Sequence, residues 1–220
     1  MSPELLIVDL DGTLVDTFED IQQGMAVALD AIGVPATAEL LALSRRGVSL
    51  EVYYQHALAR DATDLAERER FTAFVNAYVA YYETHPHSAR VYDGVADTLS
   101  EIKRRRPDLR MAVGTNKRTD LAQDVLARAG LARFFDLVQG SETVAKKPDP
   151  AMLLLIARRL EADVGRALMA GDSGADVLAA QRAGCTAVAV TYGGWPRHEL
   201  EALRPDRLID RFSELLGLVV

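Results

Sequence analysis

The chain has 220 residues, 49% of them hydrophobic, so it is long enough to bury a sizeable core in one or two domains. Its net charge of -7 and pI of about 5.2 exclude the basic surface of a general nucleic-acid-binding protein. The single cysteine, Cys185, excludes an internal disulfide framework, and no apolar stretch reaches the roughly 18 residues that a membrane span needs. We therefore expect a soluble cytoplasmic protein with neither a membrane nor a nucleic acid as its partner; these features do not indicate an oligomeric state.

Short apolar segments that alternate with helical patterns predict a parallel sheet covered by helices. The expected strands are Leu5–Asp9, Met111–Gly114, Asp136–Gln139, Ala167–Gly171 and Thr186–Thr191. The expected helices between them are Val95–Arg105, Thr119–Ala129, Pro150–Leu160 and Asp176–Ala183. This alternation is typical of right-handed βαβ units, so the predicted fold class is α/β with a Rossmann-like parallel sheet.

The stretch from Phe18 to Thr84 interrupts this alternation with helical patterns and no convincing strand. The four expected helices are Glu19–Ile32, Thr37–Leu43, Leu50–Arg60 and Asp64–Glu83. We predict a catalytic core formed by residues 1–16 and 88–220, with residues 17–87 inserted after the first strand as a helical cap domain. The chain is expected to return to the core through a hinge near His85 to Ser88. In an open parallel sheet the ligand site lies beyond the carboxyl ends of the strands, so an insertion there is expected to cover it.

Polar side chains follow each of the predicted strands. Because the carboxyl ends of parallel strands meet at one edge of a sheet, we expect these groups to lie in one crevice. They comprise four carboxylates, a hydroxyl, an amide and an ammonium: Asp9, Asp11, Asp172, Asp176, Thr115, Asn116 and Lys147. Such a set predicts a site that holds a metal ion together with a phosphate.

The carboxylates predict the metal. Mg²⁺ prefers oxygen ligands and takes one or two carboxylates plus waters and a substrate phosphate oxygen. Asp9, Asp11 and Asp172 are the expected ligands. A bound cation also offsets the repulsion between carboxylates that lie close together.

The other polar residues predict the phosphate site. Gly12 permits a tight turn that directs successive backbone N–H groups at a phosphate. The Thr115 hydroxyl and the Asn116 N–H are further donors near the start of a helix. Lys147, followed by the rigid Pro148, supplies a positive charge for a phosphoryl group during its transfer.

These motifs resemble those of the haloacid dehalogenase-like hydrolase superfamily. The chain carries Asp9-x-Asp11-Gly12-Thr13-Leu14, then Thr115-Asn116, Lys147-Pro148 and Gly171-Asp172-x-x-x-Asp176, in that order. Four motifs in order at strand ends are far more specific than any one of them. The phrases D-x-D-G-T-L-x-D, K-P-x-P and G-D-S-x-x-D are similar to those of the phosphoglycolate phosphatase-like subgroup, which has a helical cap.

The resemblance implies a role for each motif residue. Asp9 is expected to be the nucleophile that forms an aspartyl-phosphate, and Asp11 the general acid and then the general base. The Asp9 and Asp172 carboxylates and the Asp11 backbone carbonyl are the implied metal ligands. Thr115 and Lys147 are expected to bind the phosphoryl group. Because dehalogenase members lack the second aspartate, Asp11 favours a phosphatase or a mutase.

Other polar residues have more than one interpretation. Asp176, four residues beyond Asp172, is expected to support the metal site through water or Lys147, while Ser173 either shares that role or caps a helix. Arg45 and Arg46 lie in a loop of the predicted cap, where they bind an anionic group of the substrate or form a solvated turn. Asp16 is predicted to be the N-cap of the first cap helix.

The predicted function is a Mg²⁺-dependent phosphatase acting on a small phosphorylated metabolite. Arg46-Gly47-Val48-Ser49 faintly resembles the cap loop of β-phosphoglucomutase-like enzymes, so a mutase is an alternative. A pyrophosphatase or a nucleotidase is compatible with the same core. A receiver-type signalling module also gathers aspartates, a hydroxyl and a lysine around Mg²⁺, but it is much shorter and has no cap.

Overall fold

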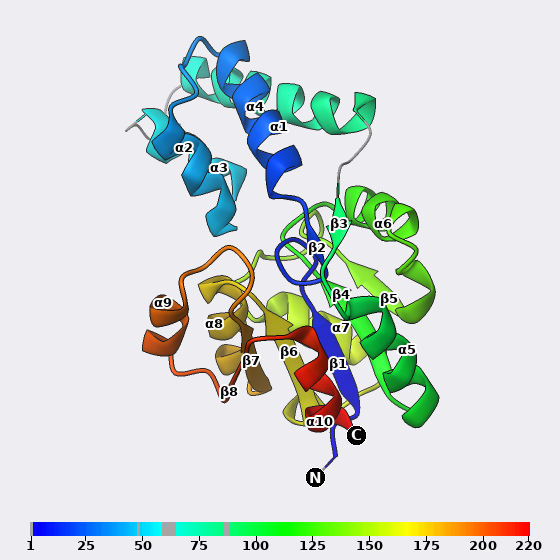
Figure 1. Cartoon of the computed structure of the whole chain (residues 1–220). Coiled ribbons are helices and arrows are strands. Elements are labelled where there is room, and N and C mark those ends of the chain that lie inside the picture. Colours follow the sequence, from blue (N-terminus) through cyan, green and yellow to red (C-terminus); the bar gives the residue numbers. More distant parts are fainter. Residues whose placement is uncertain (1, 48, 59–64, 86–88) are drawn as a thin grey trace. The chain divides into compact units, whose positions relative to one another are not determined.

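The computed structural model describes residues 2–47, 49–58, 65–85 and 89–220 (Figure 1). The chain divides into two compact units, one formed by Met1–Asp16 with Ala89–Val220 and the other by Thr17–Ser88. We call them the core unit and the helical unit. Within the described ranges, no helix combines the length and the hydrophobicity that crossing a membrane requires.

The core unit contains a six-stranded parallel sheet in the order β5-β4-β1-β6-β7-β8. Its strands are β1 (Leu5–Val8), β4 (Arg110–Gly114), β5 (Leu137–Gln139), β6 (Ala167–Gly171), β7 (Thr186–Val190) and β8 (Arg207–Ile209). Strand β1 lies inside the sheet, where Leu5 pairs with Arg110 on one side and Ala167 on the other. The predicted α/β fold with a parallel sheet is confirmed.

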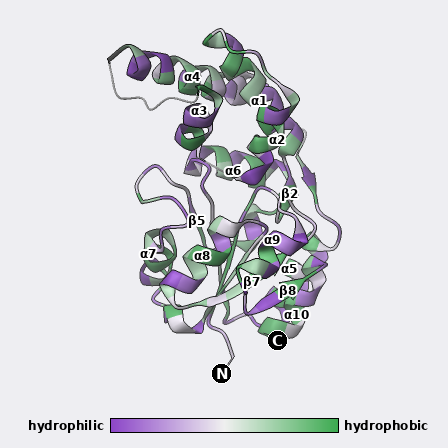
Figure 2. Ribbon diagram, turned by 90° about the vertical axis from the view of Figure 1, so that its left-hand side faces the viewer, coloured by the Kyte–Doolittle hydropathy of each residue, from purple (hydrophilic) through white to green (hydrophobic). Residues whose placement is uncertain are grey.

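The two faces of the sheet are buried under separate layers of helices. Leu6 and Val8 pack with residues of α5 and α6, whereas Leu5 and Ile7 pack with residues of α7 and α8. The helix bounds are α5 Val95–Arg105, α6 Thr119–Arg128, α7 Ala151–Arg159 and α8 Gly174–Ala183. All four β1 side chains are fully buried, which stabilises the fold by about 1.5–3 kcal/mol each. Figure 2 shows that these covering helices carry both hydrophobic and hydrophilic residues, as amphipathic helices do.

The structure adds elements that the apolar pattern does not predict. Strand β8 and the short helices α9 (Arg197–Ala202) and α10 (Leu216–Val219) complete the carboxyl-terminal part. Strands β2 (Val15–Asp16) and β3 (Arg90–Val91) form an antiparallel ribbon from which the chain leaves and re-enters the core unit. The prediction that Asp16 caps a helix is wrong, because its backbone pairs with Arg90 in this ribbon and the N-cap residue is Thr17.

The described residues of the helical unit form α1 (Phe18–Ala31), α2 (Ala38–Leu43), the 3₁₀ turn η1 (Ser44–Arg46), α3 (Leu50–Leu58) and α4 (Leu65–Thr84). Shortly after α1 ends, Gly33 adopts a φ of 68°, a left-handed conformation that commonly follows the end of a helix. The aromatic side chains of Phe74 and Tyr82 in α4 are buried, so they belong to the core of the helical unit. Most of the predicted hinge, residues 86–88, lies outside the described residues.

Candidate active site

A tight turn after β1 sets the positions of the first two aspartates. The Asp9 N–H donates to Ala170 O at 2.9 Å, so Asp9 is still attached to β6 after β1 has ended. The Leu10 carbonyl then accepts the N–H groups of Thr13, Leu14 and Val15 at 3.3, 3.0 and 3.2 Å. This closed turn fixes Asp9 at the carboxyl edge of the sheet, with Asp11 in the adjoining loop.

Lys147 occupies the middle of the carboxylate group and is 4% exposed. Its Nζ lies 2.6 Å from Asp176 Oδ1 and 3.0 Å from Asp9 Oδ1, and it donates to Gly114 O at 2.6 Å. A single ammonium therefore contacts Asp9 directly after β1, Gly114 at the end of β4 and Asp176 in α8. We call Lys147, Asp9 and Asp176 the Lys147 cluster.

The main chain of Lys147 is fixed as firmly as its side chain. The Asn116 side chain accepts from Lys147 N at 2.9 Å and donates to Lys147 O at 3.0 Å. The peptide bond between Lys147 and Pro148 is cis. Asn116 is predicted to bind the phosphate through its backbone N–H. Its side chain has a separate role, because it holds the loop that carries Lys147.

Asp172 follows β6 and accepts hydrogen bonds on both oxygens. Thr13 Oγ1 donates to Oδ1 at 3.1 Å, and Gly194 N donates to Oδ2 at 2.6 Å. Two glycines leave room for the Asp172 side chain: an added Cβ would lie 2.3 Å from Asp172 Oδ2 at Gly12 and 2.3 Å from Asp172 Cβ at Gly193. Gly12 has a φ of 82°, so glycine is needed there for its backbone conformation as well as for space.

Asp176 and Ser173 form the N-terminal cap of α8. Ser173 Oγ and Ser173 N donate to Asp176 Oδ2 at 2.6 and 3.0 Å, while the other Asp176 oxygen binds Lys147. Both residues are at least nine-tenths buried. Ser173 is therefore a helix cap, and through Asp176 the cap is connected to the Lys147 cluster.

Asp11 forms an ion pair with a different lysine, Lys117. Lys117 Nζ donates to both Asp11 oxygens at 3.1 Å. The side chains of Lys117 and Asp11 are 7% and 18% exposed, so this pair is partly protected from solvent. Lys117 follows Thr115 and Asn116 at the end of β4, and its N–H donates to Thr115 Oγ1 at 3.1 Å.

Burial and neighbouring charge act on the acidity of Asp9. Burial, reinforced by repulsion from Asp176 and Asp11, raises the pKa of Asp9 to about 7, although Lys147 acts in the opposite direction. Among the described residues, no donor is aligned for a hydrogen bond to Asp9 Oδ1, a buried atom. A buried carboxylate oxygen that lacks an aligned hydrogen-bond donor favours the binding of a further cation.

The same effects act on Asp172 and Lys147. Burial, with repulsion from Asp176 and Asp9, raises the pKa of Asp172 well above its usual range. Burial lowers the pKa of the Lys147 ammonium, but Asp176 and Asp9 outweigh it, so that the net direction is upward. The lysine therefore stays charged while the carboxylates around it are crowded.

The residues present fit a divalent cation. Ligand oxygens of Asp9, Asp172 and Asp176 all lie within 4.8 Å of one another. They are hard oxygen donors, and the single Lys147 ammonium among them does not balance the charge of three carboxylates. The carboxylate of Asp11 is not one of this group, and a contribution of its backbone carbonyl stays a prediction.

The remaining predicted site residues fall in two places. Thr115 is 1% exposed and directs Oγ1 to the Lys117 N–H at the carboxyl end of β4. Arg45 and Arg46 belong to the helical unit, where the Arg45 guanidinium lies 4.4 Å from the Phe18 ring centre. A role for either arginine in substrate binding stays a prediction.

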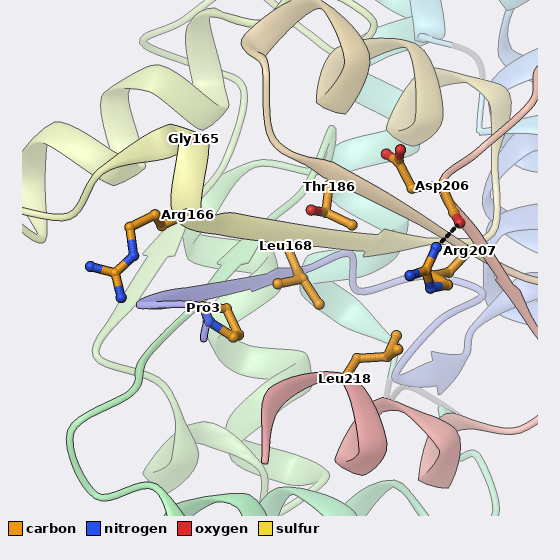
Figure 3. A pocket seen from close by; sticks show the side chains of 8 residues that line it. All are labelled: Pro3, Gly165, Arg166, Leu168, Thr186, Asp206, Arg207 and Leu218. Carbon is orange, nitrogen blue, oxygen red and sulfur yellow. Dashed lines mark hydrogen bonds between the residues drawn. The ribbon is translucent and has the colours of Figure 1, made fainter. Parts of the chain in front are cut away.

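A pocket of about 400 Å³ lies elsewhere in the core unit (Figure 3). It is lined by residues at the amino ends of strands, among them Leu168 of β6, Thr186 of β7 and Arg207 of β8. Because the sheet is parallel, these ends lie at the edge opposite the aspartates. The pocket is therefore separate from the candidate active site.

Comparison with known proteins identifies the family. A model of the family described as haloacid dehalogenase-like hydrolase matches residues 6–190. The chain is 37% identical to a probable phosphatase IndB of Dickeya dadantii, over 97% of this chain and 92% of that protein. It is 32% identical to a phosphoglycolate phosphatase of Vibrio parahaemolyticus, over 98% and 96%. A crystal structure of a predicted phosphoglycolate phosphatase from Haemophilus somnus superposes with a TM-score of 0.85 and 29% identity, covering 100% of this chain and 99% of that chain.

The region matched by the family model, residues 6–190, spans the positions of all four motifs, and the two relatives align over nearly the whole chain. The fold agrees with them, since the same edge of a parallel sheet carries all four motifs. The chain belongs to the haloacid dehalogenase-like hydrolase family, in its phosphoglycolate phosphatase-like subgroup, and is a phosphatase.

Proposed function

We propose that this phosphatase hydrolyses a small phosphate monoester in two steps through a phosphorylated Asp9. The observation that carries the proposal is the Lys147 cluster, which supports Asp9 from a rigid sheet edge with its ammonium 3.0 Å from one carboxylate oxygen. A nucleophile held in this way meets the phosphorus atom without having to be ordered first.

In the first step an Asp9 carboxylate oxygen attacks phosphorus, and the bond between phosphorus and the ester oxygen breaks. Asp11 donates a proton to that oxygen, so the alcohol leaves neutral. Lys147 and the Thr115 hydroxyl balance the negative charge on the phosphoryl oxygens, which is the main requirement of phosphoryl transfer.

In the second step water attacks the phosphorus of the aspartyl-phosphate, and Asp11 takes the proton from that water. The bond between phosphorus and Asp9 breaks, which releases inorganic phosphate and restores the Asp9 carboxylate. Asp11 thus returns to its protonated state, and the two steps balance without another reactant.

Mg²⁺ is the proposed cofactor, held by the Asp9 and Asp172 carboxylates and the Asp11 backbone carbonyl. The chemistry that a bound Mg²⁺ supplies is neutralisation of charge on the phosphate and on the ligating carboxylates. Asp176 is proposed to support the site through Lys147, whose Nζ it contacts at 2.6 Å. The crowding of Asp9, Asp172 and Asp176 supports a divalent rather than a monovalent ion.

Phosphoglycolate is the proposed substrate, because relatives over 30% identical along nearly the full chain are phosphoglycolate phosphatases. The helical unit is proposed to act as the cap domain, in which Arg45 and Arg46 contribute to specificity. The free, buried thiol of Cys185 supports a cytoplasmic location.

Release of inorganic phosphate tests the proposal directly. The purified chain, first treated with EDTA, is assayed with p-nitrophenyl phosphate and with 2-phosphoglycolate, with and without added Mg²⁺. We expect Mg²⁺-dependent phosphate release from both compounds. Absence of phosphate release from every phosphate monoester would overturn the proposal, and conversion of a sugar phosphate into its isomer would indicate the mutase instead.

A further inference from the structure

The Asp172 carboxylate is oriented by a hydrogen-bond donor on each oxygen. Thr13 Oγ1 donates to Oδ1 at 3.1 Å, and Gly194 N donates to Oδ2 at 2.6 Å. A carboxylate oxygen accepts at roughly two lone-pair sites, so among the described residues each oxygen of Asp172 keeps capacity for a cation. The two donors therefore fix the direction of the carboxylate and leave it able to act as a ligand.

The donor on Oδ1 depends on the position of the Thr13 main chain. Thr13 is fully buried, its N–H donates to Leu10 O at 3.3 Å, and its carbonyl accepts from the Tyr192 hydroxyl at 2.9 Å. A carbonyl has no proton to give, so the phenol is the donor. Because the same residue carries the hydroxyl that binds Asp172, the Tyr192 contact helps to fix that hydroxyl.

Tyr192 itself is held by the sheet and by a second tyrosine. It comes shortly after β7, which pairs with β6 on one side and β8 on the other. The N–H of the preceding residue, Thr191, donates to Ile209 O at 3.0 Å, so the contact with β8 continues up to Tyr192. The centre of the Tyr192 ring lies 4.9 Å from that of Tyr92. The phenol therefore reaches Thr13 from a position fixed by the core unit.

We propose that Tyr192 is a positioning residue for the metal site, because its hydroxyl fixes Asp172 through Thr13. Without this hydroxyl the Thr13 main chain loses a contact, and the donor on Asp172 Oδ1 is less firmly placed. A cation then has to order the carboxylate as it binds, which lowers its affinity. This inference rests on the proposed function, since it takes Asp172 as a ligand of Mg²⁺.

Direct binding of Mg²⁺ separates this role from a purely structural one. After treatment with EDTA and removal of the chelator, the Kd for Mg²⁺ is measured by isothermal titration calorimetry for the unmodified chain and for Tyr192→Phe, which lacks only the hydroxyl. Thr13→Val removes the next hydroxyl in the series, and a double variant combines both changes. Tyr81→Phe is the matched control, because the Tyr81 hydroxyl donates to Gln23 Oε1 at 2.6 Å in the helical unit.

We expect the Kd for Mg²⁺ to rise about 3- to 10-fold in Tyr192→Phe and about 10- to 100-fold in Thr13→Val. The double variant should bind Mg²⁺ about as weakly as Thr13→Val, since both changes remove the same support. Tyr81→Phe should leave the Kd unchanged. At saturating Mg²⁺, Tyr192→Phe should recover the kcat of the unmodified chain, whereas damage to the rest of the site would persist.

Three results would overturn the inference. The first is an unchanged Kd in Tyr192→Phe, and the second is an equal rise of the Kd in Tyr81→Phe. The third is a double variant in which the two effects multiply, because Tyr192 would then act independently of Thr13.

The failure of this inference differs from the failure of the proposed function. An unmodified chain that binds Mg²⁺ and releases phosphate, with the same Kd in Tyr192→Phe, contradicts the role of Tyr192 and leaves the phosphatase mechanism standing. An unmodified chain that neither binds Mg²⁺ nor releases phosphate from p-nitrophenyl phosphate contradicts the mechanism itself, and the inference falls with it.

Discussion

Asp9 and Asp11 are two residues apart, yet their surroundings differ. Asp9 belongs to the Lys147 cluster, in which one ammonium also contacts Asp176 and a backbone carbonyl. Asp11 is paired with Lys117, which donates to both of its oxygens. In the first arrangement one lysine is shared by two carboxylates at the edge of the sheet, whereas in the second a lysine donates to both oxygens of a carboxylate in the adjoining loop. Two identical side chains can therefore take the different roles of nucleophile and proton carrier.

The largest expected effect comes from removing the Asp9 nucleophile. Asp9→Asn keeps the shape of the side chain but should lower phosphate release by about 10⁴-fold or more, because the amide cannot attack phosphorus. The assay is phosphate release from p-nitrophenyl phosphate. Asp16→Asn is the matched control, since Asp16 is exposed and lies in the β2–β3 ribbon. Activity in Asp9→Asn close to that of the control would remove Asp9 from the mechanism.

Breaking the Lys147 cluster should destabilise the protein more than breaking the Lys117 pair. Lys147→Met leaves Asp9 and Asp176 buried without their cation, which costs about 3–5 kcal/mol in the free energy of unfolding. Lys117→Met should cost about 1 kcal/mol, because it removes the cation from one partly exposed carboxylate, whereas Lys147 also neutralises the fully buried Asp176. Denaturant unfolding measures both, with the exposed neighbour Lys146→Met as control. Equal losses at 147 and 117 would contradict the distinction between a lysine shared by two carboxylates and a lysine paired with Asp11.

Two glycines with similar backbone angles test the space around Asp172. Gly12 and Gly33 have φ of 82° and 68°, but a Cβ meets Asp172 only at Gly12, while nothing lies within 4 Å at Gly33. Gly33→Ala should therefore lower the free energy of unfolding by about 1–2 kcal/mol through backbone strain alone. Gly12→Ala should cost more in the free energy of unfolding, and it should also raise the Mg²⁺ concentration needed for half-maximal activity. Thermal unfolding and a Mg²⁺ titration of activity compare the two variants, and equal behaviour would show that Asp172 tolerates displacement.

The smallest expected effect concerns the cap of α8. Ser173→Ala removes the hydroxyl bonded to Asp176 and should cost about 1 kcal/mol of stability, together with a several-fold loss of activity. Thr37→Ala removes a similar cap from α2, where Thr37 Oγ1 accepts from Leu40 N at 3.3 Å. It should cost a comparable amount in thermal unfolding without a loss of activity. A loss of activity in both variants would mean that stability alone accounts for the effect of Ser173.

Much of the core site follows from one rule applied to the sequence. Asp9, Thr115, Lys147 and Asp172 follow strands that are parallel, so their meeting at one edge could be predicted without coordinates. Lys117 could not be found in this way, because the direction of a long side chain depends on what surrounds it. The only signal was its place directly after Thr115 and Asn116 at the end of a strand.

Other features depend on contacts between distant segments. The Asn116 side chain holds the main chain of Lys147, which is 31 residues away, and no local pattern encodes that pairing. Thr13 and Gly194 reach Asp172 from loops 159 and 22 residues distant. Strand β8 has three residues and begins with an arginine, so its apolar run is too short to predict a strand.

The position of the phosphoryl group on the enzyme tests the central claim most directly. Asp11→Asn cannot take the proton from water, whereas p-nitrophenol is a good leaving group that needs little help from an acid. This variant should therefore accumulate phosphorylated enzyme when it is mixed with p-nitrophenyl phosphate and Mg²⁺ and then quenched with acid. Mass spectrometry of the digested protein should find one phosphoryl group on Asp9. A phosphoryl group on another residue of the same peptide, or none on the enzyme while phosphate is released, would contradict the account.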